Sequence, residues 1–112
     1  RLSATTTPPY VAGIFSSQRT NGDAIGYDEA ARRMFDLAAQ QPGYLGMEST
    51  RDADGFGITV SYWENEEAIA AWKRNAEHAA VRQRGRLEWY EHFEIRVAKI
   101  ERASAGPRAD RR

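Results

Sequence analysis

The stretch Phe56-Gly-Ile-Thr-Val-Ser-Tyr-Trp-Glu-Asn-Glu-Glu-Ala-Ile-Ala-Ala-Trp72 changes its pattern near the middle. Its first half is rich in β-branched and aromatic side chains, which is typical of a strand, here expected over Phe56–Glu64. Asn65 is a good helix N-cap, and the two glutamates after it suit the positive end of a helix dipole. The stretch therefore predicts a strand followed at once by a short helix that runs through Trp72.

The two faces of this strand differ in character. One face is apolar and suits a tightly packed layer; it carries Phe56, Ile58, Val60 and Tyr62. The other face has small residues followed by a large ring, in the order Gly57, Thr59, Ser61 and Trp63. Because side chains alternate along a strand, the small residues leave room for a molecule to lie against the sheet. Trp63 is then a candidate for the floor of a pocket, with an ordinary core position as the alternative.

The residues before this strand predict a hairpin, a helix and a first strand. Asp52-Ala-Asp-Gly55 is typical of a tight turn, and the strand that enters it is expected over Tyr44–Arg51. Gln41-Pro-Gly43 ends an amphipathic helix, for which Asp28 is the expected N-cap. The β-rich residues Tyr10–Gln18 predict the strand that opens the domain.

Downstream, a second helical stretch is expected over Asn75–Tyr90 and a last strand over Glu91–Arg102. The order β-α-β-β-α-β predicts an α+β, ferredoxin-like domain with an antiparallel sheet, which spans residues 10–102. Residues 1–9 are expected to form a flexible arm, and residues 103–112 a disordered basic tail.

Both faces of the first strand look apolar: Ala12, Ile14 and Ser16 alternate with Val11, Gly13 and Phe15. The chain's own helices can cover one face of the sheet. The simplest cover for the other is a second copy of the protein, so a homodimer is expected. A monomer whose small residues tolerate water is the alternative.

Composition excludes several classes of protein and site. The 112 residues include 16 basic and 16 acidic side chains, and this balance argues against a nucleic-acid partner. The absence of a long apolar run argues against a membrane span, and no secretion signal is recognisable, so a cytoplasmic protein is expected. There is no cysteine, and His78 and His92 alone do not make a multi-histidine metal site.

Three segments together resemble the antibiotic biosynthesis monooxygenase (ABM) family of dimeric α+β barrel proteins. They are Gln41-Pro-Gly-Tyr-Leu-Gly-Met-Glu48, the stretch Ile58–Trp72, and Phe93-Glu-Ile-Arg-Val-Ala-Lys-Ile-Glu-Arg102. The resemblance covers residues 10–102. It implies a homodimer whose sheets pack together, with a pocket between sheet and helices in each subunit. Characterised relatives oxidise polycyclic phenols to quinones with dioxygen and without metal or flavin, while others degrade haem or handle small signalling molecules.

The resemblance also implies a role for Trp72, because haem-degrading relatives carry a tryptophan at the matching position, beside the porphyrin. Those relatives also use an asparagine near the end of the first strand and a histidine ten residues after the tryptophan. Here Arg82 stands at the second position, and Ser16, Ser17 and Gln18 close the first strand. No cofactor is therefore expected, and haem remains the disfavoured alternative.

The candidate catalytic residues are His78 and Trp72. The imidazole of His78 titrates near neutrality and can deprotonate a phenol, which then passes an electron to dioxygen more readily. The alternative is that His78 lies on the helix surface. Candidate substrate contacts, each of which can instead be structural, are Trp63, Ser16, Gln18, Arg82 and Trp89.

These residues predict a cofactor-independent monooxygenase that oxidises a small aromatic or quinol-type molecule with dioxygen. Haem binding with degradation is the second hypothesis. The third is a dimer that binds a small ligand or acts under stress without turnover. Nothing in the sequence separates the first hypothesis from the third.

Overall fold

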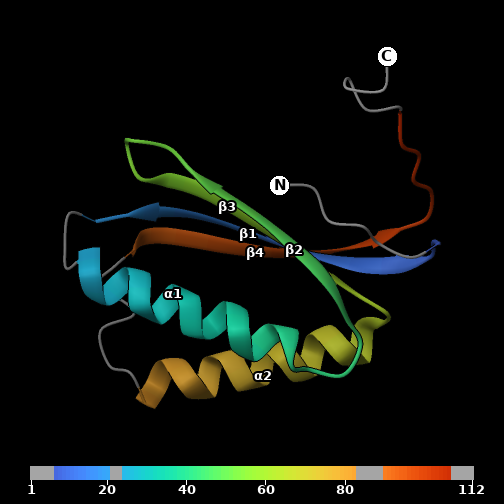
Figure 1. Cartoon of the computed structure of the whole chain (residues 1–112), viewed down its shortest axis with the longest axis horizontal. Coiled ribbons are helices and arrows are strands. Elements are labelled where there is room, and N and C mark those ends of the chain that lie inside the picture. The colour runs from blue at the N-terminus through green and yellow to red at the C-terminus, as the bar shows by residue number, and fades with distance from the viewer. Residues whose placement is uncertain (1–6, 21–23, 83–89, 107–112) are drawn as a thin grey trace.

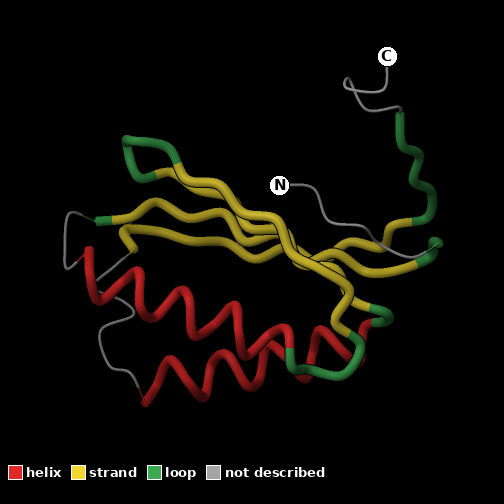
Figure 2. The backbone as a smooth tube through the Cα atoms, in the orientation of Figure 1, coloured by secondary structure: helices red, strands yellow, loops and turns green. Residues whose placement is uncertain are grey.

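The computed structural model describes residues 7–20, 24–82 and 90–106, which form an antiparallel sheet with two helices on one face (Figure 1). The elements are β1 (Tyr10–Arg19), α1 (Ala24–Ala39), β2 (Tyr44–Arg51), β3 (Phe56–Trp63), α2 (Glu66–Arg82) and β4 (Tyr90–Ile100). The strands are ordered β2-β3-β1-β4. Figure 2 shows both helices on the same side of the sheet. The predicted α+β, ferredoxin-like fold is confirmed.

The register of the sheet decides which side chains face the helices. Val11 of β1 lies opposite Trp63 of β3, and Gly13 lies opposite Ser61. A Cβ added at Gly13 would lie 2.6 Å from Cδ1 of Ile69 in α2, so this face is the helix-covered one. The face-sharing predicted for Gly57, Thr59, Ser61 and Trp63 is confirmed, because alternate residues of β3 point the same way.

The hydrophobic core lies between this face and the helices. Its buried members come from β1, α1, β3 and α2, in this order: Val11, Ala38, Trp63 and Ile69. Tyr44 and Met47 of β2 both pack against them, although residues three positions apart in a regular strand point to opposite faces. A shift of register between Tyr44 and Gly46 explains this, since the extra residue in the strand brings both side chains to the helix-covered face.

The turns that connect these elements use the predicted chemistry. Asn65 Oδ1 accepts a hydrogen bond from the backbone N–H of Ala68 at 2.8 Å and caps α2. Asp52 Oδ1 accepts from the backbone N–H groups of Asp54 and Phe56 in the β2–β3 turn. Gly43 adopts a positive φ of 84°, which frees the chain to leave α1 and enter β2.

The predicted helices differ from the observed ones in three places. α1 begins at Ala24 rather than after Asp28. α2 runs without a break from Glu66 to Arg82, where two helices were expected. Tyr90 belongs to β4, so the second helical stretch does not extend to it.

Within the described ranges, the second face of the sheet carries no helix (Figure 1). In the single chain, Phe56 is 45% exposed and Ile58 is 36% exposed, so the chain's own helices do not cover the apolar side of β3. We call this surface the open face; it also carries Ile14 and Val60, which lie opposite each other. In the part of the chain described, no helix is both long and apolar enough to cross a membrane.

Candidate functional site

The helix-covered side of the sheet brings two of the predicted site residues together. The rings of Trp63 and Trp72 stack with centroids 6.0 Å apart and an interplanar angle of 21°. Tyr44 meets Trp63 edge-on, with centroids 5.5 Å apart. Trp72 is half-buried, whereas Trp63 has no exposed surface. An aromatic wall thus joins β2, β3 and α2.

The indole nitrogen of Trp63 is a buried donor to which the described structure supplies no acceptor. Its Nε1 atom is fully enclosed and has no hydrogen-bond partner among the described residues. A buried donor left in this state costs about 1–3 kcal/mol, and most buried tryptophans avoid that cost. The site therefore contains a fixed N–H group that an oxygen acceptor would stabilise.

Hydroxyl groups continue from Trp63 along the same face of the sheet. Ser61 is 8% exposed, and its hydroxyl donates to the carbonyl of Gly13 at 3.5 Å, the outer limit for a hydrogen bond. Ser49 Oγ and Thr59 Oγ1 form a hydrogen bond of 2.7 Å across β2 and β3. The β2–β3 part of this face is therefore aromatic at Trp63 and carries hydroxyl groups toward the β2–β3 turn, while Phe15 of β1 lies opposite Thr59 on the same face.

Arg51 occupies the polar end of this face. Its guanidinium donates to the hydroxyl of Ser17 at 2.7 Å, to the Ser17 carbonyl at 3.3 Å and to the carbonyl of Gly55. Ser17 is 2% exposed, so Arg51 satisfies a buried hydroxyl. The role of Arg51 was not predicted, because 34 residues separate it from Ser17 in sequence. Alternation along β1 was the available signal that Ser17 shares a face with Phe15 and Gly13.

Tyr44 is the described phenol next to the tryptophan pair. Burial raises the pKa of Tyr44 above its usual value of 10. The phenol is consequently neutral at physiological pH, and Tyr44 contributes a ring and a hydroxyl rather than a base.

The predicted residues of the second helix are placed only in part. The backbone of α2 carries Trp72, His78 and Arg82 on one continuous helix. The side chains of His78 and Arg82, and all of Trp89, lie outside the described residues. Their assigned roles stay predictions.

Ser16 and Gln18 do not join this site. Ser16 lies opposite Ile58 and Gln18 opposite Phe56, so both belong to the open face, away from Trp63. The amide Nε2 of Gln18 donates to the carbonyl of Asp54 at 2.8 Å and ties β1 to the β2–β3 turn. The register therefore separates Ser16 and Gln18 from Trp63, and their contact with a substrate stays a prediction.

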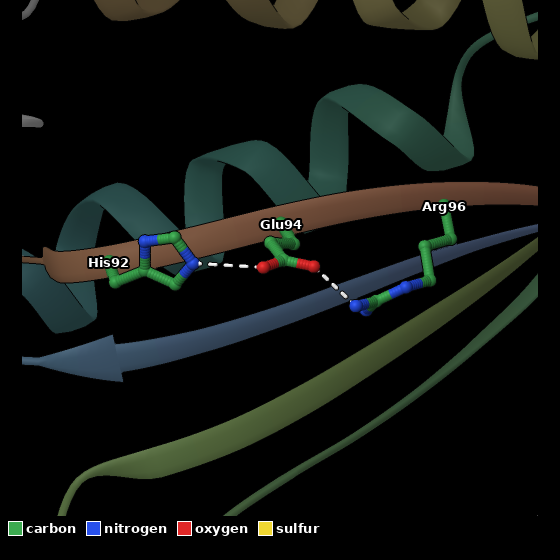
Figure 3. Close-up of polar contacts among 3 residues, drawn as sticks. All are labelled: His92, Glu94 and Arg96. Atoms are coloured by element: carbon green, nitrogen blue, oxygen red, sulfur yellow. Dashed lines mark hydrogen bonds and ion pairs between the residues drawn. The ribbon is translucent and has the colours of Figure 1, made fainter.

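The open face has two polar clusters of its own. Tyr62 donates to Glu48 at 2.7 Å, and burial, followed by this hydrogen bond and the charge of Glu48, raises the pKa of Tyr62 to about 12. On β4, His92 Nε2 lies 3.0 Å from Glu94, which also pairs with Arg96 (Figure 3). The hydrogen bond from His92, with Arg96 in support, lowers the pKa of Glu94.

The described residues also include a hollow away from the tryptophan pair, and they hold no metal cluster. Among the described side chains, no group of three or more histidines, aspartates and glutamates is arranged to hold a metal ion. A hollow of about 480 Å³ lies where β1 begins and α2 starts, and its wall combines the apolar side chains of Pro9, Tyr10 and Val11 with polar and charged ones: Glu64, Asn65, Glu66, Glu67 and Lys99.

Comparison with known proteins adds family and fold. Residues 14–84 match the family model described as antibiotic biosynthesis monooxygenase. The chain is 54% identical over 101 residues to the uncharacterised protein YqjZ of Bacillus subtilis. The matched region covers 90% of this chain and 88% of YqjZ.

Two solved structures show the same fold at low sequence identity. One is SnoaB, a cofactor-independent oxygenase from Streptomyces nogalater: 14% identical, TM-score 0.68, covering 86% of this chain and 97% of SnoaB. The other is the heme-degrading protein Rv3592 of Mycobacterium tuberculosis: 16% identical, TM-score 0.58, covering 88% and 98% of the two chains.

Proposed function

Because the chain belongs to the antibiotic biosynthesis monooxygenase family, we propose that it is a cofactor-independent monooxygenase, acting in the cytoplasm as a homodimer. Its substrate is a small aromatic or quinol-type molecule that lies on the helix-covered face of the sheet. The observation that carries this proposal is the stacked pair of Trp63 and Trp72, a flat apolar wall beside hydroxyl groups. Aromatic substrates bind through ring contacts of this kind, with few polar groups to orient them.

The proposed reaction needs no electrons from outside the substrate. A ring methylene and dioxygen yield a ring carbonyl and water: one oxygen atom enters the carbon, and the other leaves with the two hydrogens. The protein's tasks are to bind the ring, remove a proton and exclude bulk water. Removal of a proton makes the substrate an anion that transfers an electron to dioxygen more easily.

His78 is the proposed base, and Arg82 is the proposed partner of the anion. Support comes from the unbroken course of α2, which carries both residues on the helix that holds Trp72. With a rise of about 1.5 Å per residue, His78 lies about 9 Å beyond Trp72 along the helix axis. Imidazole has the pKa that general-base catalysis near neutrality requires.

Haem does not fit the residues described. The described side chains of the helix-covered face include no imidazole, and His92 lies on the open face beside Glu94. Ten residues after Trp72 the chain has Arg82, a side chain that stays protonated and does not ligate iron. The proposed reaction therefore has no haem-dependent step.

The homodimer is proposed from the open face. Phe56 and Ile58 leave 45% and 36% of their surface exposed there, beside Ile14 and Val60. Burial of this apolar surface against a second copy would remove it from water. Light scattering at micromolar concentration is expected to give twice the 12.6 kDa mass of the chain. A monomer would contradict this part of the proposal.

An oxygen electrode tests the activity. Chelator-treated protein is mixed with anthrone or a hydroquinone, and oxygen uptake is compared with that of heat-denatured protein. We expect saturable uptake that falls at least tenfold in His78→Gln, while equilibrium dialysis shows the aromatic still bound. Ring binding without uptake would instead support a ligand-binding protein without turnover.

A further inference from the structure

One row of side chains on the open face carries opposite charges at its two ends. The strand order places β2 at one edge of the sheet and β4 at the other. Residues directly opposite each other on neighbouring strands share a face, so the register lines up one side chain from each strand. From edge to edge, this row reads Glu48, Val60, Ile14 and Arg96. A carboxylate and a guanidinium thus flank an apolar centre.

Contacts within the chain hold both charged ends in place. Tyr62 donates to Oε1 of Glu48 at 2.7 Å. At the other end, Glu94 binds one nitrogen of the Arg96 guanidinium and lies beside His92 (Figure 3). The side chain of Arg96 is nevertheless 59% exposed in the single chain. Because a carboxylate accepts several hydrogen bonds and a guanidinium donates five, each end can bind a further group of opposite charge.

A second copy can pack on the open face around a two-fold axis in two aligned ways. With the axis parallel to the strands, each edge of one sheet lies over the opposite edge of the other, so Glu48 meets Arg96 of the partner subunit at both ends of the row. With the axis across the strands, β2 lies over the partner's β2. That strand carries no cation on the open face, since Arg51 lies opposite Gly57 on the other one. Charge complementarity therefore favours the axis parallel to the strands.

Side-chain size on the two inner strands favours the same arrangement. β3 and β1 lie between the edges, so an axis parallel to the strands places β3 of one copy over β1 of the other. In the row next to the charged one, the exposed Ile58 of β3 lies opposite Ser16 of β1. Ile58 then packs over the partner's Ser16, a large side chain over a small one, as interdigitated sheets require.

We infer that the open face binds a second copy of this chain around a two-fold axis parallel to its strands, with an ion pair between Glu48 and Arg96 of the partner subunit at each end of the row. This inference rests on the proposed homodimer, and it adds the direction of the axis and the residues that set the register. The ion pairs lie at the edges of the interface, where charges select the orientation of the partner more than they add affinity.

Cysteine cross-linking tests the arrangement, and the chain contains no cysteine of its own. Glu48→Cys and Arg96→Cys are mixed, allowed to exchange subunits and treated with a short bismaleimide. Strands lie about 4.8 Å apart and packed sheets about 10 Å apart. The inferred axis therefore leaves positions 48 and 96 of different copies about 10 Å apart, and the two copies of position 48 about 17 Å apart. We expect the mixed 48–96 product to predominate.

Ser49→Cys and Val97→Cys are the matched controls for the cross-link. They lie on the same two strands but on the helix-covered face, opposite Thr59 and Gly13, and should give little product. A dimer in which 48–48 and 96–96 products predominate would overturn the inferred axis and leave the homodimer standing. A wild type that stays monomeric in the ultracentrifuge would overturn both.

Charge reversal tests the ion pair itself. Arg96→Glu and Glu48→Lys each place like charges at both ends of the row, so each should raise the dissociation constant of the dimer at least about tenfold. An equimolar mixture of the two variants restores opposite charges at both ends and should dimerise as the wild type does, which also shows that both variants fold. Lys99→Glu, on β4 but on the helix-covered face, is the control and should change the constant less than about twofold.

An unchanged dissociation constant in Arg96→Glu, or no recovery in the mixture, would overturn the inference. Oxygen uptake is measured separately on the cross-linked dimer. A dimer that gives the 48–96 product without oxygen uptake would remove the proposed oxygenase and leave this inference standing.

Discussion

The guanidinium of Arg51 lies directly on the backbone of Gly57. A Cβ added at Gly57 would sit 2.6 Å from Cζ of Arg51 and 2.9 Å from both terminal nitrogens. Because Gly57 has no side chain, Arg51 of β2 can lie across β3 and reach Ser17 on β1. These residues join three strands at the polar end of the helix-covered face.

This relationship predicts that the effect of Gly57→Ala on the free energy of unfolding depends on whether Arg51 is present. In the wild type, alanine pushes the guanidinium aside and leaves the buried Ser17 hydroxyl without its partner, so unfolding free energy falls by about 1–2 kcal/mol. In an Arg51→Ala background the same change meets no obstacle. It is then neutral or stabilising, because alanine in a strand loses less entropy than glycine. Urea unfolding of the four proteins checks this, and additive effects would contradict the structural relationship.

Asn65 is expected to stabilise the start of α2, which carries Trp72. Asn65→Ala removes the acceptor for the N–H of Ala68 and lowers unfolding free energy by about 1 kcal/mol. Asn65→Ser keeps a capping oxygen and is the matched control, with a cost well below that of alanine. Thermal and urea unfolding measure both, and equal losses would show that the cap contributes little.

The phenol of Tyr62 is expected to titrate unusually late. Its pKa is raised to about 12, chiefly by burial, so the folded protein keeps the neutral form that donates to Glu48. Because the folded pKa exceeds the unfolded value, the contribution to stability is complete below pH 10 and is lost between pH 10 and about 12. Absorbance at 295 nm should show a phenol that titrates near pH 12 and that disappears in Tyr62→Phe.

Glu48→Gln is the control for that titration. Loss of the carboxylate should lower the pKa of Tyr62 while burial still holds it above 10. An unchanged titration curve in Glu48→Gln would show that the carboxylate does not act on this phenol.

Hemin is expected not to bind in the manner of a haem-degrading enzyme. The chain has Arg82 ten residues after Trp72, and the described helix-covered face offers no axial ligand. Titration with hemin should leave the Soret band where it is in buffer. A stoichiometric Soret shift that is lost in His78→Ala would show that His78 ligates iron and would restore the haem hypothesis.

Much of the sheet could be predicted from local pattern. β2 has its predicted bounds, Tyr44–Arg51, since a helix stop and a tight turn flank it. Helix ends were harder, because a good capping residue does not have to cap: Asp28 lies inside α1. α2 continues past the polar residues that suggested a break, and Asn75 there donates to Gln41 Oε1 at 2.8 Å rather than starting a new helix.

The face on which a site residue lies could be predicted from the pattern of its own strand or helix. Contacts between residues of different strands could not. Alternation along β3 put Trp63 on the right face. The bond between Arg51 and Ser17 depends on how β2, β3 and β1 align, and neither residue's own neighbours reveal it. The separation of Ser16 and Gln18 from Trp63 likewise required the register between β1 and β3.

The most direct test of the proposed oxygenase is a reaction of anthrone under ¹⁸O₂ with chelator-treated protein, followed by mass spectrometry of the quinone. The proposal predicts one ¹⁸O atom in each anthraquinone formed and the second in water, at a rate that saturates with substrate and falls in His78→Gln. A product that forms no faster than with heat-denatured protein would contradict it.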